Sequence, residues 1–537
     1  MKTKRSLAVN FAFALIFIAL VILPLVRMFF FMDRETVKAV LTSASFKKGL
    51  INSLTVSTIS TVISVVIAYL LAICIERSNI KCKSLFRVLL VLPMLVPSIS
   101  HGMGLKILLG NNGIITNMLN ISFSIYGAVG IVIGSVLYSF PVAFLMISDI
   151  LKYEDYSPYE AAKILGLGKW HQFKAITFPY LRKPLISVVF AVFTMIITDY
   201  GVPLFIGGKY TTLPVIMFEE VIGGLDFAKG SVYGTVLLFP AVVAFLFDLF
   251  NKDKGNSGFT TREFAPSKSK LSSVLSYLWC SLISFTVLIP IISFFYIGFT
   301  EKYPIDKSFT FDNITKTLDL DAGSYLVNSI VIAIFVALLG VITSYITAYM
   351  TARMKSPSSR FLHLMAMLSA AIPGIVLGLS YIIVYQKSFV AGTLAILIMV
   401  NIVHFISSPY MMIYNTLCKL NGNLEGVGQS LGISRVRMIK DVIIPQTIPT
   451  ILEMASYFFV NSMMTISAVS FLANTSTKPI SLMINQFEAQ LQLECAAIVS
   501  VVILVINLIM KLTVYLVKQT LSQQKGKMQN ESDQKTV

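Results

Sequence analysis

Few ionisable side chains interrupt the long apolar runs of this sequence. Asp199 lies inside the run at 184–206, and Lys106 lies near the end of the run at 86–109. A carboxylate in apolar surroundings is costly unless paired, hydrated or protonated, so Asp199 is either a buried polar partner or a ligand contact for an amine or a hard cation such as ferric iron. For Lys106, extension of the ammonium toward the nearer end of the run is favoured. The candidate contacts for a small solute are His101, Lys106, Asp199 and Tyr200.

The sequence lacks the residue spacings of common catalytic and metal sites. No G-x-x-x-x-G-K-[ST] phosphate-binding loop occurs, because Gly207-Gly208-Lys209 is followed by Tyr210. The four histidines are dispersed along the chain, and the five cysteines form no C-x-x-C pair, so we expect structural histidines and free thiols. We therefore predict no catalytic residue, no metal site and no cofactor bound by this chain itself.

A polar segment at 157–179 has the spacing of a short helix, a turn and a second helical segment. Ser157 and Glu160 are placed to form a capping box at the start of the first helix. Gly166 can close that helix in the left-handed conformation, and Pro179 is expected to end the second segment. The predicted element is a short, stiff surface helix.

A second polar segment, beginning at Asn423, repeats this arrangement with changes. Asn423 is a suitable helix cap, but Gly426 stands where the first segment has Glu160, and Glu425 lies one residue earlier. Gly426 and Gly428 each cost about 1 kcal/mol relative to alanine within a helix. We therefore expect the second helix to be less stable than the first when it is not docked.

The composition is that of a chain embedded in lipid. Apolar residues make up 56% of the 537 positions, charged residues make up only 13%, and the mean hydropathy is +0.79. Soluble proteins carry about 25% charged residues. The apolar residues cluster into runs of about twenty, the length of a transmembrane helix. The twelve predicted spans are 7–31, 52–75, 86–109, 127–149, 184–206, 231–250, 271–299, 327–352, 361–385, 391–416, 449–472 and 493–517.

Lysine and arginine predict the orientation of these spans. Most of the 43 basic residues lie at the two termini and in the alternate segments that share their side of the membrane. Because basic residues favour the cytoplasmic side, we predict a multi-pass cell-membrane protein with both termini in the cytoplasm. The net charge of +17 is explained by this orientation, and nucleic-acid binding is not expected.

The chain contains an internal repeat. Residues of one half recur in the other at a shift that falls in steps from 276 to 266 residues, as expected for shortened loops between homologous elements. The matched pairs are Asn52 and Asn328, Pro97 and Pro373, Gly166 and Gly432, and Pro179 and Pro445. Six spans separate the copies, an even number, so both copies have the same orientation. The predicted fold is an all-α integral membrane protein with twelve transmembrane helices in two parallel six-helix repeats.

The repeat also sets the expected domain boundaries. We predict a first transmembrane domain at 1–250, a polar cytoplasmic linker at 251–270, a second transmembrane domain at 271–518 and a polar cytoplasmic tail at 519–537. The linker is rich in glycine, serine, lysine and proline.

The first polar segment carries a recognisable pattern: E-A-A, three residues, Gly, nine residues, I-x-L-P. It resembles the signature loop of importer permeases of the ATP-binding-cassette class, with Phe178 in place of the leucine. The residues that fit the pattern are Glu160, Ala161, Ala162, Gly166, Ile176 and Pro179. The corresponding residues in the second copy are Glu425, Gly426, Gly428, Gly432 and Pro445.

This resemblance implies partners and a role. In the family, the helix of each such loop docks into a groove of an ATPase subunit and transmits its closure to the membrane bundle. Two copies of a separate ATPase, carrying the ATP and Mg²⁺, are therefore expected to bind this chain. An extracytoplasmic binding protein is expected to deliver the solute.

The resemblance also narrows the solute. Fused permeases of about this length resemble the subfamily that serves ferric iron, thiamine and 2-aminoethylphosphonate. The stretches at 198–208 and 212–214 look more like the iron and phosphonate branches than the thiamine branch. The favoured solute is 2-aminoethylphosphonate or another phosphonate, and ferric iron is the alternative. A secondary transporter with two parallel six-span halves is an alternative of a different class.

Overall fold

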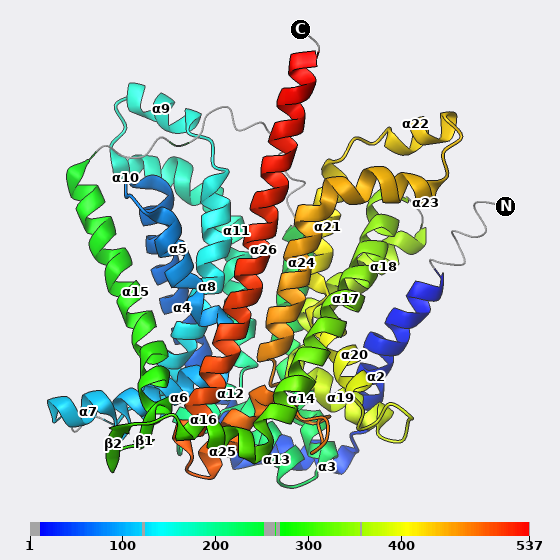
Figure 1. Ribbon diagram of the computed structural model, residues 1–537. Helices are drawn as coiled ribbons and strands as arrows, with labels where there is room; N and C mark the ends of the chain where they lie inside the picture. Colours follow the sequence, from blue (N-terminus) through cyan, green and yellow to red (C-terminus); the bar gives the residue numbers. More distant parts are fainter. Residues whose placement is uncertain (1–10, 121–123, 252–263, 265–268, 355–356, 536–537) are drawn as a thin grey trace. The chain divides into compact units, whose positions relative to one another are not determined.

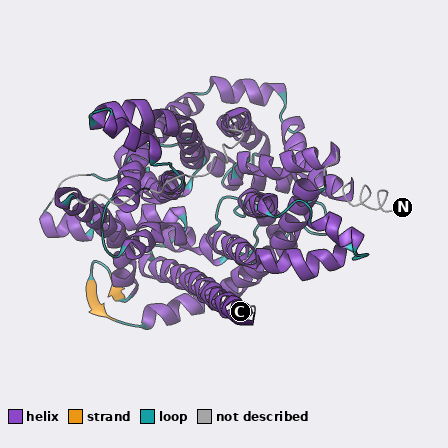
Figure 2. Cartoon of the chain, turned by 90° about the horizontal axis from the view of Figure 1, so that it is seen from above, coloured by secondary structure: helices purple, strands orange, loops and turns teal. Residues whose placement is uncertain are grey.

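The computed structural model describes residues 11–120, 124–251, 264, 269–354 and 357–535. These residues are helical almost throughout, and their two strands, β1 (Thr300–Lys302) and β2 (Asp306–Phe309), pair as one antiparallel hairpin (Figure 2). A helix satisfies every backbone polar group within its own segment, which is the requirement for apolar chain in lipid. The predicted all-α fold class is confirmed.

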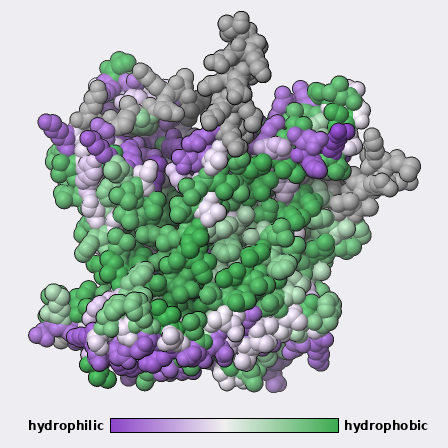
Figure 3. Space-filling view, in the orientation of Figure 1, coloured by the Kyte–Doolittle hydropathy of each residue, from purple (hydrophilic) through white to green (hydrophobic). Residues whose placement is uncertain are grey.

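Nine helices of the described residues are long and apolar enough to cross a membrane, and three bent helix pairs raise the number to twelve if each pair is one span. The nine are Phe11–Phe30 (with α2, Leu23–Phe30), Ala44–Arg77 (α4), Ala128–Lys152 (α8), Lys169–Ile197 (with α11, Phe178–Ile197), Phe227–Phe247 (in α14, Phe227–Asn251), Lys270–Gly298 (α15), Asp312–Arg353 (with α17, Gly323–Arg353), Arg435–Met464 (with α24, Ile444–Met464) and Leu493–Gln523 (in α26, Leu493–Lys535). The bent pairs are Lys83–Leu95 with Ser98–Leu119, Ser358–Ala371 with Gly374–Tyr385, and Leu394–Phe405 with Ser407–Lys419. Each predicted span overlaps one of these twelve segments in the same order. Hydrophobic side chains cover the flanks of the helices, and hydrophilic ones gather at their ends (Figure 3).

Two of the bent spans break at prolines that the repeat had already paired. The chain turns by 98° between Leu95 and Ser98, at Pro97, and by 110° between Ala371 and Gly374, at Pro373. The residue before each proline is extended, because the proline ring disfavours helical geometry there. The sequence analysis gave both segments as uninterrupted runs, so these bends are a correction. The helices that follow are α6 (Ser98–Leu109) and α19 (Gly374–Tyr385).

Two further spans end earlier than the hydropathy predicts. Helix α11 ends at Ile197 and α24 ends at Met464, whereas the predicted runs continued to 206 and 472. After Ile197 the chain breaks and restarts as the short helix α12 (Gly201–Ile206). Gly201 and Pro203 suit such an opening of the helix, because glycine and proline both weaken a helix interior.

The chain forms two compact units whose bounds differ from those of the sequence repeats. We call residues 31–317 and 484–501 the first unit, and residues 1–30, 318–483 and 502–537 the second unit. The first unit therefore holds spans two to seven, and the second unit holds span one together with spans eight to eleven. Each sequence half contributes its first span to the unit formed mainly by the other half. The long helix α26 begins in the first unit and continues in the second, as a helix to Lys535 (Figure 1).

Specific contacts hold each exchanged span. In the second unit, α2 packs against α19, and just before it the Leu20 carbonyl accepts a hydrogen bond from the Tyr381 hydroxyl at 2.8 Å. In the first unit, α15 packs against α4 and α6, and its Ser276 hydroxyl bonds Ser78 at 2.6 Å. A side chain at Gly104 of α6 would meet Pro290 of α15, so the glycine permits this close approach.

Candidate functional site

The two polar loops that the sequence singled out have the same backbone course. We call residues 155–179 the first loop and residues 421–445 the second loop. The first contains α9 (Ser157–Ile164), α10 (Lys169–Gln172) and a π-helical turn η3 (Phe173–Thr177). The second contains α22 (Leu424–Ser430), α23 (Arg435–Met438) and a π-helical turn η6 (Ile439–Ile443). The later elements correspond residue by residue at a shift of 266, which confirms the predicted repeat.

Both loop helices close at a left-handed glycine, as predicted. Gly166 has φ +70° and Gly432 has φ +69°. The residue after each glycine donates its amide to a carbonyl five positions back, Leu167 to Ala162 at 2.9 Å and Ile433 to Gly428 at 2.8 Å. Together with the glycine amide bonds at 3.1 Å, this is the Schellman closure that satisfies the last carbonyls of a helix.

The start of each loop helix differs from the prediction. Neither Ser157 nor Asn423 accepts a capping bond from the helix. Instead, the Asp155 carboxylate accepts from the Ser157 amide at 3.0 Å, and the Asn421 side chain accepts from the Asn423 amide at 3.0 Å. Both are Asx turns, which fix the chain just before the helix. The repeated pair Asp-x-Ser and Asn-x-Asn at a shift of 266 was the sequence signal for this motif.

Pro179 and Pro445 do not end the segments that precede them, which is a second correction. Each proline lies in the first turn of its span helix, α11 or α24, directly after the π-helical turn. Proline lacks an amide donor and its ring crowds the carbonyl four residues back. The wider π turn relieves this conflict, so the helix passes through without a break.

In the first loop, Arg77 at the end of α4 forms an ion pair with Glu154. The Tyr159 hydroxyl of α9 donates to the other Glu154 oxygen at 2.6 Å and lies 2.6 Å from the Thr177 hydroxyl of η3. Glu154 and Tyr159 are 3% and 8% exposed, so this polar chain is shielded from water. It connects the end of span two to both helical parts of the loop.

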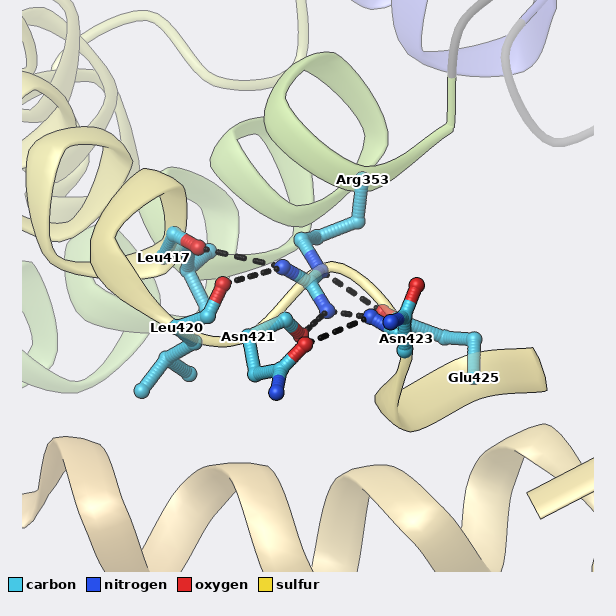
Figure 4. A network of polar contacts seen from close by, with 6 residues as sticks. All are labelled: Arg353, Leu417, Leu420, Asn421, Asn423 and Glu425. Atoms are coloured by element: carbon cyan, nitrogen blue, oxygen red, sulfur yellow. Dashed lines mark hydrogen bonds and ion pairs between the residues drawn. The ribbon is translucent and has the colours of Figure 1, made fainter. Parts of the chain in front are cut away.

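In the second loop, Arg353 at the end of α17 takes the place of Arg77 and makes different contacts (Figure 4). Its Nε donates to Glu425 of α22 at 2.7 Å, and its Nη2 also contacts that carboxylate. The remaining donors bond the carbonyls of the preceding turn: Nη1 to Leu420 at 3.0 Å and Nη2 to Asn421 at 2.8 Å. One guanidinium therefore ties span eight to both the start and the interior of the second loop.

The register of the two loops explains the shifted acid. At a shift of 266, Glu425 corresponds to Tyr159, and Gly426 corresponds to Glu160. The position of Glu425, one residue before Gly426, had suggested a displaced copy of Glu160. The register shows instead that Glu425 corresponds to Tyr159. It occupies the helix position that faces the arginine in both loops.

The carboxyl groups of the two loops differ in pKa. Burial raises the pKa of Glu154 above its usual value, although Arg77 and Tyr159 oppose the rise. Burial also acts to raise the pKa of Glu425, but the hydrogen bonds from Arg353, a backbone amide bond and the charges of Arg353 and Arg435 together outweigh it, and the pKa is lowered. Burial and the bond to Glu154 raise the pKa of Tyr159 to about 12, so this hydroxyl remains a donor at neutral pH.

Each loop exposes an apolar face. Leu165 and its counterpart Leu431 are 75% and 68% exposed, and Ile164 of α9 is 87% exposed. Trp170 and its counterpart Val436 are also exposed. Ala162 and Gly428, two of the predicted coupling residues, are buried on the opposite side of their helices, whereas Glu160 is half-buried and Ala161 and Gly426 are exposed. Clustered apolar side chains outside the membrane runs are typical of protein docking surfaces.

The candidate solute contacts do not gather at one place. Asp199 lies in the break between α11 and α12, where it accepts from the Ser98 hydroxyl at 2.6 Å and from the Val202 amide at 3.0 Å. A cavity of about 10 Å³ lies beside it, lined also by Ser57 and Thr212, whose hydroxyls are buried without a hydrogen-bond partner. Such a cavity has room for about one water molecule.

The other three candidates are engaged elsewhere in the first unit. His101 is buried, with Nε2 3.1 Å from the Pro93 carbonyl. Lys106 forms an ion pair with Glu488. Tyr200 is buried and stacks on Phe218 with ring centres 4.7 Å apart. The described residues contain no group of three or more histidine, cysteine or acidic residues placed to hold a metal ion.

Comparisons with known proteins agree with the duplicated loops. The family described as binding-protein-dependent transport system inner membrane component matches the chain twice, at 64–252 and 340–523. A ferric transport system permease protein of Actinobacillus pleuropneumoniae is 26% identical over 484 residues, which cover 85% of this chain and 70% of that protein. A molybdenum transport system permease protein of Azotobacter vinelandii is 26% identical over 214 residues, 38% of this chain and 93% of that protein. A thiamine transport system permease protein of Haemophilus influenzae is 24% identical over 194 residues, 35% of this chain and 36% of that protein.

Proposed function

The chain belongs to the family of binding-protein-dependent transport system inner membrane components, whose match covers both repeats, and from this premise we propose that it is the fused permease subunit of a ferric iron importer. Its role is to form the path through which the iron crosses the membrane. Hydrolysis of ATP, with its Mg²⁺, takes place on a separate ATPase. A secreted binding protein presents the iron on the outer side, and both termini of the permease lie in the cytoplasm.

The observation that carries the coupling role is the shared construction of the two loops. Each has a short helix with an Asx turn before it and a Schellman closure after it, tied by an arginine to the end of a span. Each presents an exposed leucine at the same position, Leu165 or Leu431. A force applied to either helix reaches the membrane bundle through the arginine and through the continuous helix that follows the loop. Two ATPase subunits, one per loop, fit this duplication.

Ferric iron is preferred over a phosphonate because of the relatives. A protein named as a ferric transport system permease aligns along most of this chain, whereas the thiamine and molybdenum proteins align over about a third of it. The stretches at 198–208 and 212–214 resembled the iron and phosphonate branches alike, and the preference for 2-aminoethylphosphonate finds no support among these relatives. The family match also favours binding-protein-dependent import over a secondary transporter.

The test is uptake by a reconstituted complex. The chain is co-expressed with the ATPase and the binding protein proposed as its partners, purified, and placed in vesicles with the binding protein on the side opposite the ATPase. We expect ATP-dependent uptake of ferric iron that neither thiamine nor 2-aminoethylphosphonate inhibits. Inhibition by 2-aminoethylphosphonate, or uptake of it in place of iron, would overturn the ferric assignment. Co-purification of one ATPase per chain would contradict the proposed stoichiometry.

Asp199 is proposed to face the path and to contact the solute through its carboxylate oxygens. Its position at a helix break, beside a small polar cavity, supports this role. Its bonds to Ser98 and Val202 equally suit a carboxylate that caps α12. The Asp199→Asn variant keeps an oxygen for these bonds and removes the charge. We expect uptake to fall strongly while the variant still assembles with the ATPase, and full uptake would leave Asp199 as a capping residue.

A further inference from the structure

Phe264 lies in the polar stretch at 251–270 that joins the two sequence repeats, far along the chain from the first loop. Its ring nevertheless packs edge-on against two tyrosines of that loop. The ring centres are 4.8 Å from Tyr156 and 5.0 Å from Tyr159, with interplanar angles of 63° and 69°. Tyr156 and Tyr159 stack on each other at 6.1 Å. The three rings form a compact group over the start of α9, in the edge-to-face geometry that aromatic rings prefer.

The same ring lies against the arginine that anchors the loop. The Arg77 guanidinium carbon is 4.4 Å from the centre of the Phe264 ring and 5.7 Å from the centre of the Tyr159 ring. The Nε atom of Arg77 is buried without a hydrogen-bond partner, so the ring faces take the place of an acceptor on that side. A cation over an aromatic face is held more strongly when water is excluded.

The aromatic group covers a buried polar chain. Glu154 accepts from both Arg77 and Tyr159, and Tyr159 continues to Thr177 in the π-helical turn. Polar networks of this kind are strong only while water is kept from them, because water competes for each bond. Removal of the Phe264 ring would expose the guanidinium and, with it, the bond between span two and α9.

The second loop is held without an aromatic cover. Arg353 satisfies its donors with Glu425 and backbone carbonyls, and no cation–ring contact found in the described residues involves it. The aromatic group is therefore specific to the first loop.

We propose that Phe264 is a positioning residue: its ring clamps the first loop helix onto the end of span two. The contact of Phe264 with the first loop belongs to this chain alone. Only the assignment of that loop to ATPase docking rests on the proposed function. The consequence of the clamp is that the two loops of one chain have different stiffness.

The test measures loop opening in the purified full-length chain in lipid nanodiscs, by hydrogen exchange of peptides from α9 and α22. Phe264→Ala is expected to speed exchange in α9 by about tenfold, the effect of losing aromatic and cation–ring contacts, and to leave α22 unchanged. Phe264→Tyr, which keeps the ring, should retain the protection. Phe264→Leu, which keeps apolar cover without a π face, should fall between the two.

The matched control is Phe389→Ala, which removes an aromatic ring that is 95% exposed and should change neither loop. Unchanged exchange in α9 of Phe264→Ala, or equal acceleration in both loops, would overturn the clamp. Because the measurement needs no ATPase, iron or binding protein, its failure would leave the transport function untouched. A failure of iron uptake would likewise leave the clamp in place.

Discussion

The first and second loops follow one backbone course but are held by different side chains. In the first loop, the acid that meets the arginine is Glu154, outside the helix, and the helix contributes Tyr159. In the second loop, the acid is Glu425, inside the helix at the position of that tyrosine. The first network has the more buried acid and is covered by rings, whereas the second has the more buried arginine and uses backbone carbonyls.

This difference shows which part of the duplicated device is fixed and which part is free to vary. The Asx turn, the left-handed glycine and the π turn before proline recur at equivalent positions, and all three determine the backbone. The ion pair is rebuilt from other residues. The two loops therefore present helices in the same local frame but should respond differently to mutation and to pH.

The largest effect is expected at the arginines. Arg353→Ala leaves Glu425 without its partner, and such a loss costs about 3–5 kcal/mol when the pair is buried, with the lower end expected here because Glu425 is 18% exposed. Arg353→Lys should recover little of this, because one ammonium cannot replace a guanidinium that bonds through all three nitrogens. In the first loop, Arg77→Lys should keep more of the stability that Arg77→Ala loses, because Arg77 contacts Glu154 through a single nitrogen. Hydrogen exchange of the loop peptides measures the free energy of local opening in all four variants. If lysine restored the same share of the lost stability in both loops, this distinction between them would be wrong.

A smaller and equal effect is expected at the closing glycines. Gly166→Val and Gly432→Val force a β-branched residue into a left-handed backbone, which costs about 1–2 kcal/mol. Nothing lies within 4 Å of a side chain added at either position, so both variants carry backbone strain alone. Gly168→Val is the control, because Gly168 also has open space but an extended backbone. Unequal losses in the two loops, measured by the same exchange experiment or by ATPase binding, would show that the closures are not equivalent.

Substitution by alanine should have different effects at the two glycines within the second helix, Gly426 and Gly428. Gly426→Ala is expected to gain about 1 kcal/mol of helix stability, because the position is open and alanine is the better helix former. Gly428→Ala should gain less, because its added carbon would lie 1.9 Å from the Met438 methyl carbon and this buried side chain would have to move aside. Gly426→Glu should gain no more than the alanine variant, since neither loop uses a capping box. Exchange of the α22 peptide gives the comparison, and a gain at position 428 equal to that at 426 would contradict this packing.

The smallest effect is a response to pH of opposite sign in the two loops. A lowered pKa in the folded loop means that Glu425 stabilises the second loop above its unfolded pKa and that this contribution is lost as pH falls through the folded value. A raised pKa means that Glu154 contributes to the first loop below its unfolded pKa and that this contribution is lost as pH rises through the folded value. Acidification from about pH 7 to below about pH 4 should therefore loosen the second loop and stabilise the first. Exchange rates corrected for the intrinsic effect of pH measure both loops, and Glu425→Gln should abolish the response in the second loop only.

The sequence predicted those features that local physics determines. Runs of about twenty apolar residues gave every span in order, and the recurrence of Gly166 at Gly432 gave both helix closures. The bends at Pro97 and Pro373 were missed, because hydropathy depends on residue type alone and carries no information on the direction of the helix axis. The prolines, already paired by the repeat, were the signal that could have located them.

Other features had no signal in the sequence. The exchange of the first spans between the units depends on which lipid-facing surfaces meet, and an apolar helix has the same hydropathy whichever neighbour it finds. Phe264 was one aromatic residue in a polar stretch, and its contact with Arg77 follows only from the fold. The solute path was the least predictable, because the four candidate residues were chosen by type and the fold engages each of them separately.

The placement of the first span has a consequence for how the protein is made. The Leu20 carbonyl, just before α2, can accept its hydrogen bond only after Tyr381, 361 residues later, has been synthesised. A ribosome that adds about 5–20 residues per second needs roughly 20 to 70 seconds to supply that partner. During this interval span one lacks the hydrogen bond and the packing that α19 later provides. Span one and span nine therefore meet only after all the spans between them have been synthesised.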